Sequence, residues 1–232
     1  MPNQTVIAEN IHRLQERIAD FAAKYARPVN DILLLAVSKT RPVEDLLAAY
    51  QAGQRHFGEN YLQEALVKIQ SLQNTDIQWH FIGAIQSNKT RDIANEFDWV
   101  HSVDRSKIAR RLSEQRSPDR APLNICLQVN ISNERTKAGI TPDMLTQLAK
   151  EISTLPNIKL RGLMAIPVKT DSFHEQRSIF QQMHQAMDQL NQQGFSLDTL
   201  SMGMTEDMEA AIAEGATIVR IGTAIFGPRA QK

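Results

Sequence analysis

Short apolar segments alternate with longer amphipathic segments along most of this 232-residue chain. The short segments have the length of β-strands, and they fall at 32–39, 56–60, 79–83, 99–103, 123–131, 160–166, 200–204 and 217–221. The first, rich in Leu and Val, is typical of a strand buried on both faces. Helical patterns separate the segments, and most connections are only a few residues long. Eight strands, each followed by a helix or by the end of the chain, predict an α/β fold of the (β/α)8 TIM-barrel type.

An additional helix precedes the first predicted strand. Between Asn3 and Tyr25 the apolar residues fall on one helical stripe, which Pro28 ends. The expected organisation is one domain over residues 1–232, with the N-terminal helix in 1–27 and the barrel in 30–229. An open doubly wound sheet is the alternative, but it would usually carry Gly-x-Gly-x-x-Gly after its first strand. Here that turn reads Ser-Lys-Thr-Arg-Pro, which favours the barrel.

The composition argues against several classes of protein. Lys and Arg together number 26 and so do Asp and Glu, so no net charge attracts nucleic acid or an anionic membrane. The single cysteine, Cys126, excludes an internal disulfide, and no His or Cys cluster predicts a metal site. No apolar run approaches the roughly 20 residues of a membrane span, and no signal peptide opens the chain. We expect a soluble, cytoplasmic protein.

Two further groups of residues are expected to have structural roles. His56 and His101 are expected to pack or to cap. A basic cluster around the helix after the fourth strand has no interleaved aromatic residues, so we expect a solvent-exposed face and no nucleic-acid site. Its members are Arg110, Arg111, Arg116 and Arg120.

Lys39 ends the first predicted strand, which is almost wholly apolar. The carboxyl ends of parallel strands meet at one mouth of a barrel, where ligands bind. At this position the lysine could be a surface charge, or an amine held for the carbonyl group of a ligand. Burial disfavours an ammonium ion and lowers the pKa of a lysine, which would supply free amine near neutral pH.

Small and hydroxyl-bearing residues end the last two predicted strands. The seventh ends in Ser201-Met202-Gly203-Met204 and the eighth in Arg220-Ile221-Gly222-Thr223, where many barrels bind phosphate. Glycine lets a phosphate approach backbone N–H groups, and a hydroxyl adds a donor. We therefore expect a phosphate on the backbone after the eighth strand, with Ser201 reaching across. The alternative is that Gly203 and Gly222 only permit tight turns.

A phosphate site opposite a strand-end lysine suggests a phosphorylated aldehyde that is bound as a Schiff base. Pyridoxal 5'-phosphate (PLP) is the commonest ligand of this kind. Several motifs of the chain resemble those of one family, the YggS or pyridoxal phosphate homeostasis proteins, which bind PLP. These motifs are Ala36-Val37-Ser38-Lys39-Thr40, Phe57-Gly58-Glu59-Asn60-Tyr61, Trp79-His80-Phe81-Ile82-Gly83, Gln86-Ser87-Asn88-Lys89, Arg161-Gly162-Leu163-Met164, Ser201-Met202-Gly203-Met204 and residues 219–227.

The resemblance covers about residues 32–229 and implies a single barrel of PLP fold-type III, similar to the N-terminal domain of alanine racemase. It implies that Lys39 carries the cofactor as an internal aldimine and that Arg220 faces the pyridine nitrogen. By the same resemblance, Ser201, Gly222 and Thr223 hold the phosphate. The other residues expected at the cofactor are Asn60, His80, Met164, Met202 and Gly203.

The same residues bear on whether the protein is an enzyme. The permanent charge of Arg220 would keep a pyridine nitrogen unprotonated, which weakens the ring as an electron sink. Racemases of this fold type need a second acid/base group, which the resemblance assigns to a separate C-terminal domain of a partner subunit. The chain ends at Lys232, shortly after the last predicted strand, so we expect no such domain. The prediction is a non-catalytic PLP carrier and buffer in intracellular PLP (vitamin B6) homeostasis.

Two alternatives stay open. One is a PLP-dependent amino-acid racemase with weak or narrow activity, and the other is a barrel that binds a phosphorylated metabolite without a Schiff base. Lys137 follows the fifth predicted strand, and it is either a solvated loop lysine or the group that takes the aldehyde from Lys39 during release. Apo forms of PLP-dependent enzymes are the expected recipients, and we expect a monomer.

Overall fold

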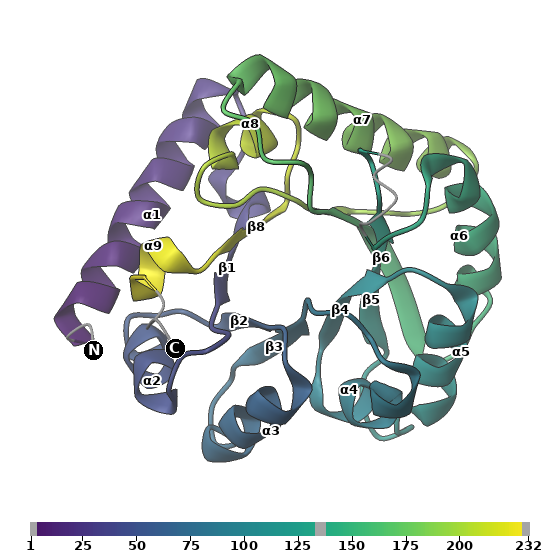
Figure 1. The fold of residues 1–232 in the computed structure, drawn as a ribbon, viewed down its shortest axis with the longest axis horizontal. Helices are drawn as coiled ribbons and strands as arrows, with labels where there is room; N and C mark the ends of the chain where they lie inside the picture. Colours follow the sequence, from purple (N-terminus) through teal and green to yellow (C-terminus); the bar gives the residue numbers. More distant parts are fainter. Residues whose placement is uncertain (1–3, 133–137, 229–232) are drawn as a thin grey trace.

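In the computed structural model, which describes residues 4–132 and 138–228, eight parallel strands close into a barrel. The strands follow one another around the barrel in chain order, and β8 pairs with β1 to close it. Their bounds are β1 Leu33–Val37, β2 His56–Glu59, β3 Gln78–Phe81, β4 Trp99–Val103, β5 Leu123–Val129, β6 Ile158–Ala165, β7 Thr199–Ser201 and β8 Ile218–Ile221. The helices surround the strands (Figure 1). The predicted barrel is confirmed.

The helices lie between successive strands in the chain. The α-helices are α1 Gln4–Lys24, α2 Val43–Gln51, α3 Leu62–Ser71, α4 Thr90–Glu96, α5 Ser106–Gln115, α6 Leu145–Ser153, α7 Phe173–Gln192, α8 Met208–Ala213 and α9 Thr223–Phe226. Short 3₁₀ turns are η1 Val29–Asp31, η2 Ser87–Lys89 and η3 Pro142–Met144. The short helix α9 was not predicted, because four residues are too few to show a helical period. In the described ranges, no helix is long and apolar enough to cross a membrane.

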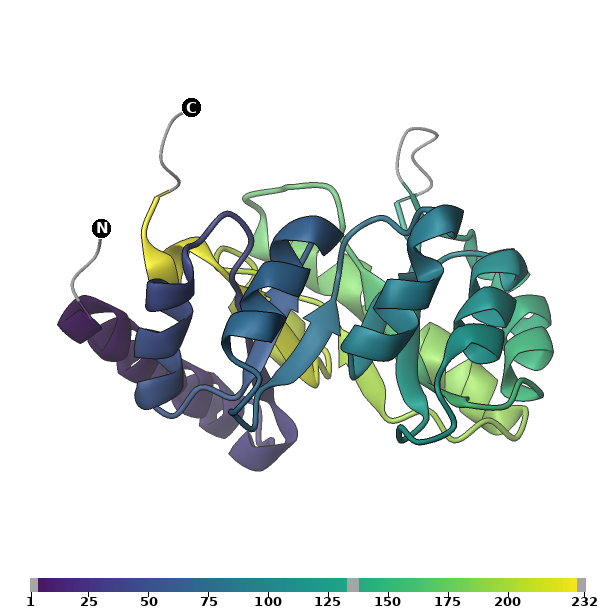
Figure 2. The same ribbon diagram turned by 90° about the horizontal axis from the view of Figure 1, so that it is seen from below.

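The N-terminal helix α1 covers the seam where the barrel closes. Its buried side chains recur every three or four positions, which places them on one face: Ile7, Ile11, Leu14, Ile18 and Ala22. This face packs against α2, α8 and α9, beside the β1–β8 pair (Figures 1 and 2). Lys24 Nζ and Tyr25 Oη donate to Glu209 Oε1 at 2.7 and 2.9 Å and hold the end of the helix against α8.

Alternate residues of each strand face opposite sides of the barrel wall. Leu34 and Ala36 of β1 belong to the main core between strands and helices, whereas Leu35 joins Ile82 and Ile218 in a separate apolar group. Leu35 also pairs in register with Arg220 of β8. The first and last strands of the barrel therefore present side chains to the same region.

One side chain of the predicted basic cluster differs from expectation. Arg116 is only 4% exposed, and its guanidinium donates to the carbonyl oxygens of Phe97 and Ala121 at 2.7 and 2.6 Å. Burial lowers its pKa. The prediction that this arginine faces solvent is wrong, because it binds the backbone of the turn that leads into β5.

Candidate functional site

A cavity of about 190 Å³ lies at the carboxyl ends of the strands. We call it the mouth cavity. Its wall is built from residues that follow β1, β2, β3, β6 and β7 and from β8 itself, and it combines apolar, polar and cationic side chains: Val37, Lys39, Arg41, Asn60, Ile82, Ile166, Met204, Thr205, Arg220, Gly222 and Thr223. Residues from both ends of the chain meet here because β1 lies beside β8.

Lys39 lies in the turn between β1 and α2, and two side chains of α3 hold the residues on either side of it. Thr40 has φ 63°, a left-handed conformation that is unusual for a β-branched residue. Its N–H donates to Glu64 Oε1 at 2.6 Å, and Lys68 Nζ donates to the carbonyl oxygen of Ser38 at 2.7 Å. The backbone that carries Lys39 is therefore fixed from both directions.

Glu59 completes this buried group, which we call the lysine clamp: Ser38, Glu59, Glu64 and Lys68. Its Oε1 accepts from Ser38 Oγ at 2.6 Å and from Lys68 Nζ at 2.7 Å, while Lys68 also donates to Glu64 Oε1 at 2.5 Å. Burial raises the pKa of Glu59, and Lys68 opposes that shift by stabilising the carboxylate. Buried ion pairs add little net stability, so we interpret the clamp chiefly as a means of shaping the Lys39 turn.

Arg220 supplies a buried cation to the mouth cavity. Its side chain is 5% exposed, and Nη1 donates to Ser201 O at 2.5 Å and to Ser201 Oγ at 2.9 Å. Nη2 donates to Ala165 O at 2.8 Å. Burial lowers the pKa of Arg220 to about 10, and the nearby Asp207 carboxylate acts in the opposite direction. The guanidinium is thus cationic at neutral pH and held in one orientation.

The structure brings half of the predicted cofactor residues to the wall and leaves the rest buried elsewhere in the barrel. Those on the wall are Lys39, Asn60, Arg220, Gly222 and Thr223. Those buried away from it are His80, Met164, Ser201, Met202 and Gly203. Lys137, the predicted transfer residue, lies outside the described residues.

Ser201 is not placed where the sequence reasoning expected its hydroxyl. It is fully buried, and its Oγ lies 2.7 Å from His101 Nδ1 and 2.9 Å from Arg220 Nη1. The chain runs on through Gly203 and Met204 before it reaches the wall, where Thr205 presents the hydroxyl-bearing side chain. That Ser201 holds a phosphate stays a prediction, and Thr205 is the better-placed donor.

Six wall residues were not among the predicted cofactor residues: Val37, Arg41, Ile82, Ile166, Met204 and Thr205. The predicted site consisted mainly of the last residues of strands and of two Ser/Gly/Thr motifs, whereas the wall extends into the loops beyond them. Thr205 directly follows the motif at the end of β7. Reading that motif one residue further would have found it.

The wall fits a phosphorylated aldehyde such as PLP. A Cβ at Gly222 would lie 3.1 Å from the carbonyl oxygen of Val37, so a larger residue would crowd the end of β1 at the wall. Asn60 Oδ1 is buried and has no hydrogen-bond partner within the described part of the chain. It is a polar group that a ligand hydroxyl can satisfy. With the amine of Lys39 and the cation of Arg220, the donor set suits a ligand that carries an aldehyde and a phosphate.

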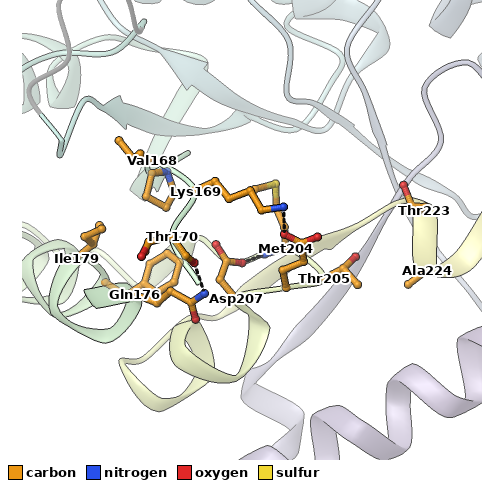
Figure 3. A pocket seen from close by; sticks show the side chains of 13 residues that line it. Val168, Lys169, Thr170, Gln176, Ile179, Met204, Thr205, Asp207, Thr223 and Ala224 are labelled. Carbon is orange, nitrogen blue, oxygen red and sulfur yellow. Dashed lines mark hydrogen bonds and ion pairs between the residues drawn. The ribbon is translucent and has the colours of Figure 1, made fainter. Parts of the chain in front are cut away.

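A second cavity of about 400 Å³ adjoins the mouth cavity and shares Met204, Thr205 and Thr223 with it. Figure 3 shows it bounded by the loops after β6 and β7. Lys169 of the first loop pairs with Glu206 of the second at 2.8 Å (Figure 3). A ligand at Thr223 would therefore have further space on this side.

Residues 4–132 and 138–228 provide neither a metal site nor a reactive cysteine. No group of three or more His, Cys, Asp or Glu side chains there could hold a metal ion. Cys126 is buried, and burial raises the pKa of its thiol to about 12, so the thiolate that acts as a nucleophile does not form near neutral pH.

The chain is similar to proteins of one named family. The family described as alanine racemase, N-terminal domain, matches residues 7–230. The pyridoxal phosphate homeostasis protein of Pasteurella multocida is 52% identical over 227 residues, which cover 96% of this chain and 97% of the relative. The structure of PipY from Synechococcus elongatus with PLP bound matches with a TM-score of 0.84 and 38% identity, covering 95% of this chain and all of that one. Alanine racemase from Corynebacterium glutamicum shares the fold, with a TM-score of 0.72 at 13% identity over 97% of this chain and 61% of the racemase.

Proposed function

The chain belongs to the alanine racemase N-terminal domain family and, within it, to the pyridoxal phosphate homeostasis proteins, and from this membership we propose that it binds PLP and buffers its supply. The protein acts as a carrier of the cofactor and not as a catalyst. One observation carries the proposal: Lys39, Arg220 and the open backbone of Gly222 line the same small cavity. The structure of the relative PipY with PLP bound supports it.

Each wall residue has a separate task in this proposal. When bound, PLP supplies an aldehyde that condenses with a primary amine, and a phosphate that needs hydrogen-bond donors. Lys39 provides the amine at the end of β1. Thr205 and Thr223 provide hydroxyl donors beside the Gly222 backbone. Arg220 contributes a fixed positive charge and keeps its own proton at neutral pH, since its pKa is about 10.

The titratable groups of the wall favour a carrier over a racemase. Racemisation needs a proton donor or acceptor on each face of the substrate. Among the described residues of the mouth cavity, the ionisable side chains are Lys39, Arg41 and Arg220, and arginine does not exchange its proton near neutral pH. One lysine alone cannot serve both faces. The site is therefore suited to binding and release.

Borohydride reduction with peptide mapping tests the proposed site. The protein loaded with PLP should lose its yellow colour and gain the cofactor's mass on the peptide that contains Lys39. Lys39→Ala should abolish both changes. Lys169→Ala is the matched control, because this exposed lysine lines only the adjoining cavity, and it should be labelled like the parent protein. Labelling confined to another lysine, or no labelling, would overturn the proposal.

An amino-acid racemase with weak or narrow activity is the alternative, which is tested because the chain shares its fold with alanine racemase. Circular dichroism of amino-acid solutions incubated with the PLP-loaded protein separates the two candidates. The carrier shows no change in optical activity over a panel of amino acids, whereas sustained turnover that Lys39→Ala abolishes would establish the racemase. A barrel that binds a phosphorylated metabolite without a covalent link would give neither turnover nor borohydride labelling.

The carrier proposal extends to location, assembly and transfer. It places the protein in the cytoplasm as a monomer, with apo forms of PLP-dependent enzymes as recipients. Lys137, outside the described residues, is proposed to take the aldehyde from Lys39 during release. Recovery of activity by an apo-enzyme mixed with the loaded protein should be slower for Lys137→Ala than for the parent, and an equal rate would remove Lys137 from the proposal. Sedimentation velocity measures the assembly state.

A further inference from the structure

A chain of hydrogen bonds crosses the interior of the barrel and ends at Arg220. His56 Nδ1 lies 3.0 Å from His80 Nε2, and His80 Nδ1 lies 2.9 Å from His101 Nε2. His101 Nδ1 lies 2.7 Å from Ser201 Oγ, which is 2.9 Å from Arg220 Nη1. These five residues come from β2, β3, β4, β7 and β8. We call them the histidine chain.

The histidine chain joins the two ends of the barrel. His56 begins β2 and lines a cavity that the residues before β1 and β2 form with Gln15 and Ile18 of α1, at the end opposite the mouth. His80, His101 and Ser201 are fully buried. Arg220, at the other end, lines the mouth cavity. A polar path therefore replaces part of the apolar packing that usually fills such a barrel.

Burial, with the charge of Arg220, keeps the histidines of the chain neutral. Burial lowers the pKa of His56, His80 and His101. The guanidinium of Arg220 lowers the pKa of His101 further, and among the described residues the one carboxylate that opposes these shifts at a histidine of the chain is Asp98, near His56. A second positive charge next to the buried arginine is thus disfavoured.

Neutrality gives the chain a single direction. Each neutral imidazole has one donor and one acceptor nitrogen, and arginine can only donate. Ser201 Oγ accepts from Arg220, and its other hydrogen-bond partner among the described residues is His101 Nδ1, so the hydroxyl proton is satisfied only when it is donated to that nitrogen. His101 then carries its proton on Nε2 and donates to His80 Nδ1. His80 in turn donates from Nε2 to His56 Nδ1, and every bond in the chain is satisfied.

We propose that the histidine chain positions Arg220. It directs the Ser201 hydroxyl proton away from the guanidinium, so that Ser201 Oγ stays an acceptor and Arg220 keeps one orientation at the mouth cavity. His80 and His101 are positioning residues and do not touch a ligand. The assignment accounts for the burial of His80 and Ser201 beneath the wall, where the sequence reasoning expected ligand contacts. It rests on the proposed function only for the statement that Arg220 faces PLP.

The ligand-free protein provides the first test. Nuclear magnetic resonance of protein with ¹⁵N-labelled histidine should show His80 and His101 as neutral rings protonated on Nε2. Couplings between nitrogens should be visible across the His56–His80 and His80–His101 bonds. A proton on His101 Nδ1, or no coupling, would overturn the chain. The result does not depend on PLP, so it stands or falls separately from the proposed function.

Variants test whether the chain acts on Arg220. His101→Leu removes the acceptor of the Ser201 proton, whereas His101→Asn retains an acceptor close to Nδ1. Ser113→Ala, a change at a buried residue of α5 outside the histidine chain, is the matched control. His101→Leu should broaden the Arg220 guanidinium resonances of the ligand-free protein and raise the Kd for PLP about tenfold, the effect of one hydrogen bond to a charged group. His101→Asn and the control should stay within about threefold of the parent protein.

The ring nitrogen of bound PLP gives an independent signal. With ¹⁵N-labelled PLP, His101→Leu should shift the ring-nitrogen resonance and Ser113→Ala should not. A folded His101→Leu with the parent's Arg220 signal, Kd and ring-nitrogen resonance would overturn the proposal. If His101→Leu fails to fold, Ser201→Ala removes the same link at Arg220 and is measured in the same way. If the parent does not bind PLP, the proposed function fails, and the Arg220 signal of the ligand-free variants still decides the positioning role.

Discussion

Lys68 Nζ lies 2.7 Å from the carbonyl oxygen of Ser38, the residue directly before Lys39. A buried side chain of α3 thus fixes the backbone from which the Lys39 amine projects. Lys68 is held in turn by Glu59 and Glu64, neither of which lines the mouth cavity. The position of the amine therefore depends on charges that do not take part in binding.

Replacing Lys68, the cation of the lysine clamp, should lower the free energy of unfolding. Lys68→Met leaves the fully buried Glu59 carboxylate without its cation, and breaking a buried pair in this way costs about 3–5 kcal/mol of the free energy of unfolding. Urea titration of the ligand-free protein measures the loss. Adding Glu59→Leu to Lys68→Met should restore much of it, because no charge is then left unpaired. Lys24→Met breaks an exposed pair with Glu209 and should barely move the midpoint, and a loss there as large as for Lys68→Met would contradict the role of burial.

Acid should destabilise the fold through His101. Burial and Arg220 lower its pKa from 6.5 to about 3, so the unfolded chain takes up a proton at a higher pH than the folded one. The stability that neutral His101 contributes to the folded state is fully present above pH 6.5. It is lost as the pH falls toward 3, by about 1.4 kcal/mol of the free energy of unfolding per pH unit. Urea midpoints at about pH 7 and pH 5 measure the slope. His101→Asn should have a shallower slope, and equal slopes would show that another group governs the acid limit.

An alanine at Gly83 should disturb both stability and binding. Its Cβ would overlap the carbonyl group of Asn60, whose side chain lines the mouth cavity. The strands β2 and β3 would have to separate at this point, which should lower the urea midpoint and raise the Kd for PLP. Gly53→Ala is the control, since nothing lies within 4 Å of a Cβ there and only its φ of 95° is unfavourable. It should cost about 1 kcal/mol and leave PLP binding unchanged.

The hydroxyl of Thr205 should matter for PLP binding. Thr205→Val keeps the shape of the wall and removes one donor beside Gly222, so fluorescence titration should show a Kd for PLP that is about tenfold higher. Thr170→Val changes a hydroxyl that lines only the adjoining cavity and should leave the Kd near that of the parent protein. Equal affinities for the parent and Thr205→Val would remove this hydroxyl from the site.

The barrel was predictable because alternating strand and helix patterns leave few ways to bury the strands. Five predicted site residues, Lys39, Asn60, Arg220, Gly222 and Thr223, line one cavity for a related reason. Parallel strands bring their carboxyl ends together, so position along the chain is enough to group them.

The depth of each side chain was not predictable. A strand pattern tells which side chains share a face, but their height in the barrel depends on the stagger between strands. His80 and Ser201 thus lie beneath the wall while Thr205 reaches it. The hydrogen bonds between His56, His80 and His101 depend on that same stagger. For this reason the expectation that His56 and His101 only pack or cap was incomplete.

The pairing of β1 with β8 joins the strand that the ribosome makes first to the strand that it makes last. Lys39 leaves the ribosome early, whereas Arg220, Gly222 and Thr223 follow only when the last strand has been made. A nascent chain that lacks β8 has the Lys39 amine but neither the buried arginine nor the glycine backbone of the mouth cavity. Such a chain should compete poorly for an aldehyde that attacks any exposed amine. Translation of the last strand would then mark the moment at which each new molecule begins to take cofactor from the cell.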